Sequence, residues 1–82
     1  MTESQETQRL TGLIAEILRV PKTQIVDTLD MEATSTWDSL SHMQLIAAIE
    51  DEFGIELTAD EIILMRSVGQ IKGMLRDKSV NA

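Results

Sequence analysis

The sequence predicts an all-α protein: a small four-helix bundle with three longer helices, one short helix and a long first loop. Three observations predict this fold. Apolar residues recur three and four positions apart in separate segments. Residues that cap helices stand at the start of the later segments. The length of 82 residues suffices for a single domain, 1–82, with an ordered core expected over about 6–76 and a frayed C-terminal tail.

A first helix is expected from about residue 6 to residue 19. Its apolar residues are spaced so that they fall on one face of a helix. Pro21 disfavours helical geometry at Val20 and therefore ends the predicted helix. The apolar face consists of Leu10, Leu13, Ile14, Ile17 and Leu18.

A long connection follows, from residue 20 to residue 37. A structureless loop of this length is uncommon in a compact domain unless it is functional or held to the core. We expect Ile25 and Leu29 to hold it to the core, with a short turn near residues 23–26.

The second predicted helix begins after Asp38, whose carboxylate can accept from backbone N–H groups of the first turn. It runs to about Phe53, and Gly54 suits the left-handed conformation that closes a helix. The inner face of this helix is expected to contain Leu45, Ile46, Ile49 and Phe53.

Two capping signals predict the remaining helices. Thr58 and Glu61 form a capping box, which predicts a short third helix to about Met65. Ser67 and Gln70 repeat the signal at the start of a last helix. The apolar face of that helix consists of Val68, Ile71, Met74 and Leu75.

Composition limits the possible locations and chemistry. The chain contains no cysteine, which excludes a disulfide framework and a zinc–thiolate site. Its longest apolar runs fall far short of the ~20 residues that span a bilayer. The polar, acidic beginning is unlike a secretion signal. We therefore expect a cytoplasmic protein without membrane insertion.

The formal net charge of -7 is concentrated in the middle of the chain. No basic residue lies between Thr23 and Met65. Such a one-sign surface repels nucleic acid and anionic lipid and attracts basic protein surfaces. The simpler alternative is a solvated face that only maintains solubility. The acidic residues of this window are Asp27, Asp30, Glu32, Asp38, Glu50, Asp51, Glu52, Glu56, Asp60 and Glu61.

Ser39 is the most informative residue of the chain. It stands in the first turn of the second predicted helix, directly after Asp38. A helix start concentrates unpaired N–H groups and the positive end of the helix dipole, so it accepts an anion readily. Serine after aspartate is in isolation ordinary capping chemistry. We interpret Ser39 as a tethering point for a covalently attached phosphate group, and not as a catalytic nucleophile.

Together these features resemble a known family. Asp38-Ser39-Leu40, the helix closing on residues 50–55, and the capped short helix after it resemble acyl carrier proteins and their peptidyl and aryl carrier relatives. The resemblance covers the whole chain in length, helix order and long first loop. Its sequence-specific part lies between Trp37 and Val68.

The resemblance implies a carrier and not an enzyme, with no catalytic residue of its own. A phosphopantetheinyl transferase would use coenzyme A to modify Ser39, leaving 4'-phosphopantetheine attached as a phosphodiester. Asp38 beside it would belong to the same cofactor-binding site. This arm ends in a thiol on which acyl intermediates are carried as thioesters. Further partners would be acyl-transferring, ligase or synthase enzymes with basic docking patches, and we expect the carrier to be a monomer.

The resemblance also implies a partner-docking role for the second helix. Leu40 and Met43 would offer apolar contact, with acidic residues around them. The third helix would contribute Ile62, which with Met65 would wall an apolar interior. The resemblance implies that four further residues face partners, namely Asp38, Gln44, Ala47 and Asp51.

Three positions depart from the usual fatty-acid carrier. Thr36 and Ser41 stand where glycine and an acidic residue are frequent, and Gln44 replaces a frequent glutamate. A specialised pathway that makes polyketides, hybrid peptides or modified lipids is therefore at least as well indicated as fatty-acid biosynthesis. Peptidyl and aminoacyl carriers, including D-alanyl carriers, share the same features.

Other residues have simpler interpretations. Trp37 is expected to be a half-buried anchor. His42 lies one turn after Ser39, but no third residue is positioned to orient it, so we expect a surface histidine. Met43, Met65 and Met74 are expected to fill the core or its edge.

The alternating positions of a calcium-binding loop would be occupied by Asp30, Glu32, Thr34, Thr36 and Asp38. Ser35 and Ser41 nevertheless stand where that motif requires glycine and glutamate, so we predict no metal site. An acidic helical adaptor without a prosthetic group, and a metal-sensing helical module, are the alternatives from other functional classes.

Overall fold

The structure is a computed structural model that describes residues 5–78. Within these residues it contains four α-helices, one short 3-10 helix and no extended strand, which confirms the predicted all-α class. Of the C-terminal tail that was expected to fray, residues 79–82 lie outside the described residues. The elements are α1 (Gln5–Leu18), η1 (Lys22–Gln24), α2 (Ser39–Phe53), α3 (Ala59–Leu64) and α4 (Val68–Asp77).

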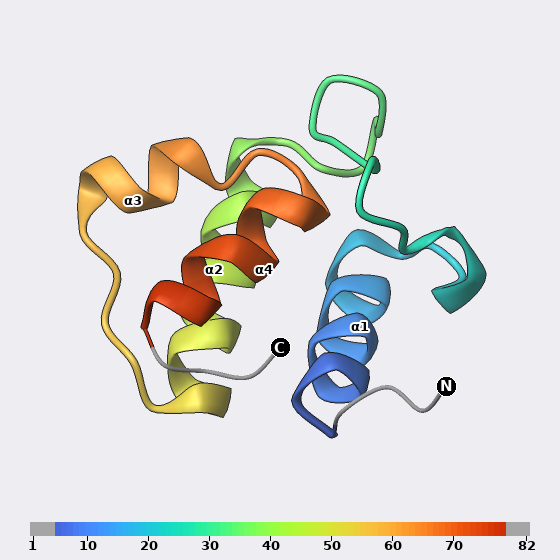
Figure 1. Cartoon of the computed structure of the whole chain (residues 1–82). Coiled ribbons are helices and arrows are strands. Elements are labelled where there is room, and N and C mark those ends of the chain that lie inside the picture. Colours follow the sequence, from blue (N-terminus) through green and yellow to red (C-terminus); the bar gives the residue numbers. More distant parts are fainter. Residues whose placement is uncertain (1–4, 79–82) are drawn as a thin grey trace.

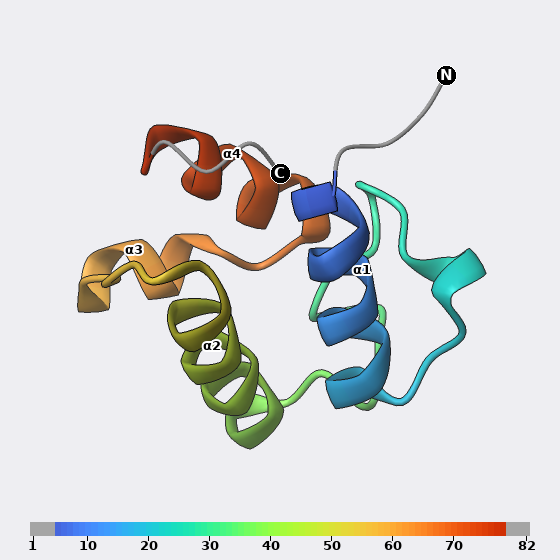
Figure 2. The same ribbon diagram turned by 90° about the horizontal axis from the view of Figure 1, so that it is seen from below.

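The helices form a bundle in which α1, α2 and α4 supply most of the core. α1 and α2 pack against each other and run in opposite directions, with the long first loop joining their ends (Figure 1). α3 lies on the side of α2 away from α1, and α4 crosses one face of the molecule (Figure 2). The Arg9 guanidinium pairs with the Glu52 carboxylate, which ties the beginning of α1 to the end of α2. In the described part of the chain, no helix is long and apolar enough to cross a bilayer.

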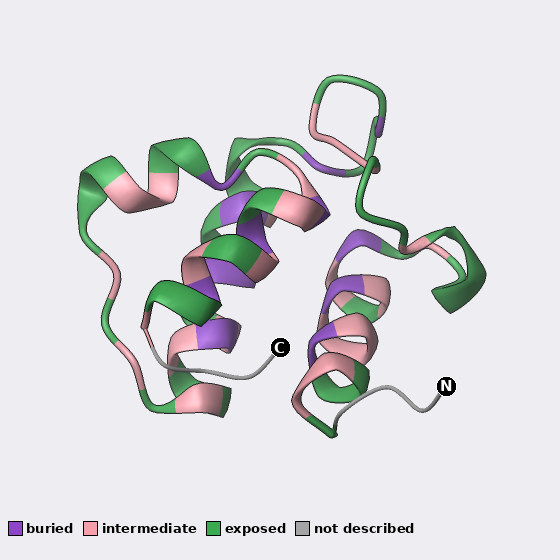
Figure 3. Cartoon of the chain, viewed as in Figure 1, coloured by how far each residue is buried: buried purple, intermediate pink, exposed green. Residues whose placement is uncertain are grey.

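The core lies where the apolar faces of α1, α2 and α4 meet. Buried residues line the inward side of these helices and alternate with exposed ones on the outside (Figure 3). Leu13, Ile17, Phe53 and Met74 of the predicted faces are only partly buried and pack at the margin of the core. The fully enclosed core comprises Leu10, Ile14, Leu18, Trp37, Leu45, Ile46, Ile49, Met65, Val68, Ile71 and Leu75.

The predicted helix boundaries of α2 and α3 are confirmed by their capping contacts. Asp38 Oδ1 accepts from the Ser41 backbone N–H at 2.8 Å. Gly54 closes α2 in the left-handed region at φ 64°. Thr58 and Glu61 make the reciprocal capping box of α3, as expected.

The cap of α4 differs from a true capping box. Ser67 Oγ accepts from the Gln70 N–H at 3.1 Å, but the Gln70 side chain accepts from the Arg66 N–H. The Gln70 side chain therefore satisfies a donor one residue earlier than predicted.

The first helix ends in an unusual way. The chain reverses at Arg19, which has a left-handed φ of 59°, and the Val20 N–H donates to the Ala15 carbonyl at 3.1 Å. This is the Schellman arrangement, whose left-handed position is usually glycine because other residues are strained there. Arg19 is the only non-glycine residue with positive φ among residues 5–78.

The long first loop is held to the core, as predicted. Ile25 and Leu29 are partly buried against it, and η1 accounts for the expected short turn. The loop also bonds to the start of α4, since the Val68 N–H donates to the Leu29 carbonyl at 3.0 Å and the Gly69 N–H donates to the Asp27 carbonyl at 2.9 Å. These contacts fix the path along which the chain approaches α2.

Candidate functional site

Ser39 is the first residue of α2, and it is exposed. Asp38 before it has an extended conformation, so the chain turns sharply into the helix at this point. Trp37, one residue earlier, is only 2% exposed and belongs to the core. An enclosed side chain thus anchors the approach to a serine that faces solvent.

The carboxylate of Asp38 is held beside Ser39 in its ionised form. Its pKa lies below the usual value, chiefly because the Ser41 backbone N–H donates to it and secondarily because the Ser41 side chain bonds to it. A carboxylate at a helix N-terminus is also favoured by the helix dipole. The serine is therefore flanked by a fixed negative charge at neutral pH.

His42 corrects the sequence-based expectation of a surface histidine. It is 7% exposed, and both of its ring nitrogens have partners. The Trp37 Nε1–H donates to His42 Nδ1 at 3.0 Å, so Nε2 carries the hydrogen and donates to the Ile62 carbonyl at 3.0 Å. Its position three residues before Leu45 and four before Ile46 puts it on the inner face of α2. That spacing was the signal in the sequence that could have revealed its burial.

Trp37 corrects a second expectation. It is enclosed and not half-buried, because its indole packs into the core while its N–H finds a partner in His42. The two side chains lie with ring centroids 6.1 Å apart. Through the Ile62 carbonyl they connect the start of α2 to α3.

The residues assigned to partner docking on α2 lie on its outer face. Leu40 is 70% exposed and Met43 is 52% exposed. Met43 is therefore not the core or edge filler that was expected, whereas Met65 is fully buried. The other exposed members are Asp38, Gln44, Ala47 and Asp51.

On α3, the residue predicted to bind partners is Ile62, but the exposed apolar residues are the two that follow it. Ile62 is partly buried and packs against the core. Ile63 and Leu64 are exposed by 64% and 58%. A six-residue helix whose last three residues are all apolar cannot turn all of them to the core, and that run was the available signal. We use the term exposed apolar surface for Leu40, Met43, Ile63 and Leu64.

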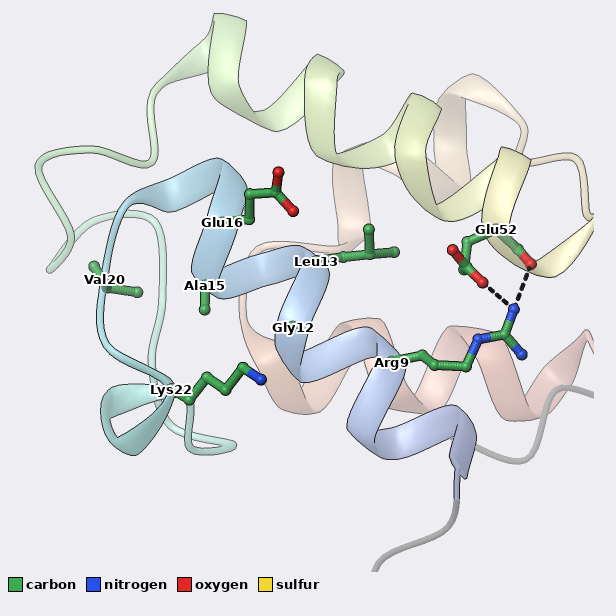
Figure 4. A pocket seen from close by; sticks show the side chains of 8 residues that line it. All are labelled: Arg9, Gly12, Leu13, Ala15, Glu16, Val20, Lys22 and Glu52. Carbon is green, nitrogen blue, oxygen red and sulfur yellow. Dashed lines mark hydrogen bonds and ion pairs between the residues drawn. The ribbon is translucent and has the colours of Figure 1, made fainter.

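A surface hollow runs along α1 from Arg9 to Val20 and Lys22, and Glu52 at the end of α2 also lines it (Figure 4). Arg9 reaches across it to the Glu52 carboxylate and carbonyl, and its guanidinium lies 5.5 Å from the centre of the Phe53 ring. Ser39 and Glu52 are separated by most of α2, roughly 20 Å at 1.5 Å per residue. Neither Ser39 nor its neighbours in sequence line this hollow.

A family model described as "Phosphopantetheine attachment site" matches residues 8–75, which is most of the chain. The chain therefore belongs to the phosphopantetheine attachment site family. The covalent group of this family is 4'-phosphopantetheine.

Curated relatives are similar to the chain along nearly its whole length. It is 27% identical to an acyl carrier protein of Saccharopolyspora erythraea over 94% of this chain and 81% of the relative. It is 26% identical to an acyl carrier protein of Thermosynechococcus vestitus over 95% and 96% of the two chains. With an acyl carrier protein of Lactobacillus acidophilus the identity is 30%, over 84% and 86%. The resemblance to acyl carrier proteins is thus confirmed.

Proposed function

We propose that Ser39 is the residue that carries 4'-phosphopantetheine, and that the chain presents acyl cargo on this group to partner enzymes. One observation carries the proposal: in a chain of this family, Ser39 is an exposed hydroxyl at the first residue of a long helix. The helix dipole favours a phosphodiester there. The enclosed Trp37, two residues earlier, anchors the backbone that leads into Ser39.

Attachment is a phosphoryl transfer in which the transferase supplies the catalytic groups. The Ser39 oxygen forms a bond to the phosphorus next to the pantetheine of coenzyme A. The bond from that phosphorus to the bridging pyrophosphate oxygen breaks, and adenosine bisphosphate leaves. The serine proton passes to a base of the transferase. No base in this chain is required, which agrees with the inward position of His42.

The attached group supplies the thiol that the cysteine-free chain lacks. Acyl cargo would be carried on it as a thioester in a fatty-acid, polyketide or related specialised pathway of the cytoplasm. Ser41 and Gln44, in place of acidic residues, support a specialised pathway at least as well as fatty-acid biosynthesis. A peptidyl or aminoacyl carrier, including a D-alanyl carrier, is the alternative within the same class.

Partner enzymes would bind the outer face of α2 and the adjoining part of α3. The exposed apolar surface would be removed from water on binding, which favours association. The carboxylates of Asp38 and Asp51 would attract basic patches on the partner. Rim charges of this kind chiefly raise the association rate and are weakened by salt. Ile62 would contribute indirectly, because its carbonyl bond to His42 keeps α3 beside α2.

Intact-mass analysis after incubation with coenzyme A and a broad-specificity phosphopantetheinyl transferase tests the proposal. We expect one added phosphopantetheine in the wild type, none in Ser39→Ala, and full addition in the matched control Ser35→Ala, which removes an exposed hydroxyl from the first loop. An unmodified wild type, under conditions that modify a known carrier, would overturn the proposal and favour an adaptor without a prosthetic group.

A further inference from the structure

A groove of about 310 Å³ runs beside Ser39 on the side of α2 that faces α1. Three residues that flank Ser39 in sequence line it, namely Asp38, Leu40 and Ser41. It therefore begins next to the proposed attachment point. Its remaining lining residues are Ile17, Arg19, Thr36 and Gln44.

Arg19 is the only cation in the lining of this groove. Its side chain has no hydrogen bond or ion pair with any other residue that the structure describes, and it is exposed. Arg9, Lys72 and Lys78 are in contrast each paired with a carboxylate. The groove thus contains an uncommitted guanidinium, which is the side chain best shaped to bond two oxygens of a phosphate.

The groove differs in its chemistry from the rest of the exposed apolar surface. Met43, Ile63 and Leu64 do not line the groove, and these exposed apolar residues of α2 and α3 offer no donor to an anion. On the α1 side, the groove combines the Arg19 guanidinium with the Ser41 hydroxyl and the Gln44 amide. The phosphopantetheine arm is a phosphodiester followed by a chain with amide groups. Its charge and its hydrogen-bonding groups match those of Arg19, Ser41 and Gln44 in the groove.

We propose that this groove binds the phosphopantetheine arm of the carrier in its resting position, with Arg19 pairing with the phosphodiester. Ser41 and Gln44 would bond to the amide groups of the arm, while Ile17 and Leu40 would contact its apolar part. Asp38 also lines the groove, and its carboxylate is directed to the Ser41 N–H. The inference rests on attachment at Ser39 and adds where the arm lies when no partner is bound.

The backbone conformation of Arg19 allows a substitution that removes its side chain and leaves the turn intact. Glycine is the residue best suited to its φ of 59°, so Arg19→Gly removes the guanidinium without straining the turn. The apo form of Arg19→Gly should melt at or above the temperature of the wild type. Arg76→Ala is the matched control, because it removes one exposed positive charge from α4, outside the groove.

Solution NMR of the isotopically labelled apo and holo carriers tests the inference. We expect nuclear Overhauser contacts from the methyl groups of the arm to Ile17 and Leu40. We also expect apo-to-holo shift changes at Ser41 and Gln44 that fall by more than half in Arg19→Gly and persist in Arg76→Ala. Contacts to Met43, Ile63 and Leu64 instead, or shift changes unaffected by Arg19→Gly, would overturn the inference.

Mass analysis of the same samples separates the two proposals. If no phosphopantetheine is added, attachment at Ser39 fails. If the group is present on Ser39 but the arm makes no contact with the groove, only the resting position is wrong.

Discussion

The indole N–H of Trp37 donates to Nδ1 of His42 across 3.0 Å within the core. Because the other ring nitrogen bonds to the Ile62 carbonyl, the residue that precedes Asp38-Ser39 is connected to α3 through one imidazole. Buried polar groups are costly unless they are all satisfied, and here the indole and both imidazole nitrogens are satisfied. The connection ties α3, which carries the exposed Ile63 and Leu64, to α2, which carries the exposed Leu40 and Met43.

Replacing His42 should therefore destabilise the protein. His42→Ala leaves the Trp37 N–H without its partner and opens a cavity, with an expected loss of about 1–3 kcal/mol in the free energy of unfolding. Urea unfolding followed by circular dichroism measures it. Gln44→Ala, an exposed change on the same helix, should stay within about 0.5 kcal/mol of the wild type. Equal losses for the two variants would show that the imidazole bonds contribute nothing.

Two of the three glycines in open surroundings, Gly12 and Gly54, should respond in opposite directions to alanine. An added Cβ meets nothing within 4 Å at either Gly12 or Gly54, so only the backbone conformation differs. Gly54→Ala should cost about 1 kcal/mol, because Gly54 has φ 64°. Gly12→Ala, inside α1, should stabilise by about 0.5–1 kcal/mol. Thermal unfolding of both variants checks the signs, and a shift in the same direction for both would contradict the explanation.

Asp38 should make stability depend on pH in the acid range. Its pKa in the folded state lies below 3.8, chiefly because of the bond from the Ser41 N–H, so folding favours the ionised form. The contribution is complete above pH 3.8 and is lost as the pH falls through the folded-state value. The difference in unfolding free energy between wild type and Asp38→Asn should therefore shrink on acidification. A difference that stays constant throughout acid titration would refute this assignment.

Leu40 should matter to partners more than to folding. Its side chain is 70% exposed, so Leu40→Ala should change the unfolding free energy by less than about 0.5 kcal/mol. If it contacts the transferase, kcat/KM for modification should fall about tenfold, which corresponds to roughly 1–2 kcal/mol. Val26→Ala removes an exposed apolar side chain from the first loop and serves as the control. Identical kcat/KM values for the two variants would exclude Leu40 from the docking surface.

The helix boundaries were predictable because their signals are local. Asp38, Thr58 and Ser67 bond to N–H groups three residues ahead in their own helices, and Gly54 takes the conformation that its missing side chain permits. The apolar periodicity of α1 likewise identified Leu10, Ile14 and Leu18 as core residues. Such features depend on neighbours along the chain, which a single sequence contains.

The features that local signals did not decide depend on how the chain is arranged in the folded protein. His42 is polar, and its burial becomes favourable only when Trp37 and the Ile62 carbonyl supply partners for both nitrogens. Arg19 gives no local sign of a left-handed conformation, since glycine is the residue that normally signals it. The exposure of Ile63 and Leu64 follows from the way that α3 packs, with Ile62 turned to the core.

The most direct test of the central claim is site mapping on the protein isolated from cells that express it. Trypsin should release residues 23–66 as one peptide, because no basic residue lies between Thr23 and Met65. Fragmentation of this peptide by tandem mass spectrometry distinguishes Ser39 from Ser35 and Ser41. We predict a phosphopantetheine group on Ser39. A peptide that carries the group on another residue, or that is never modified, would contradict the account.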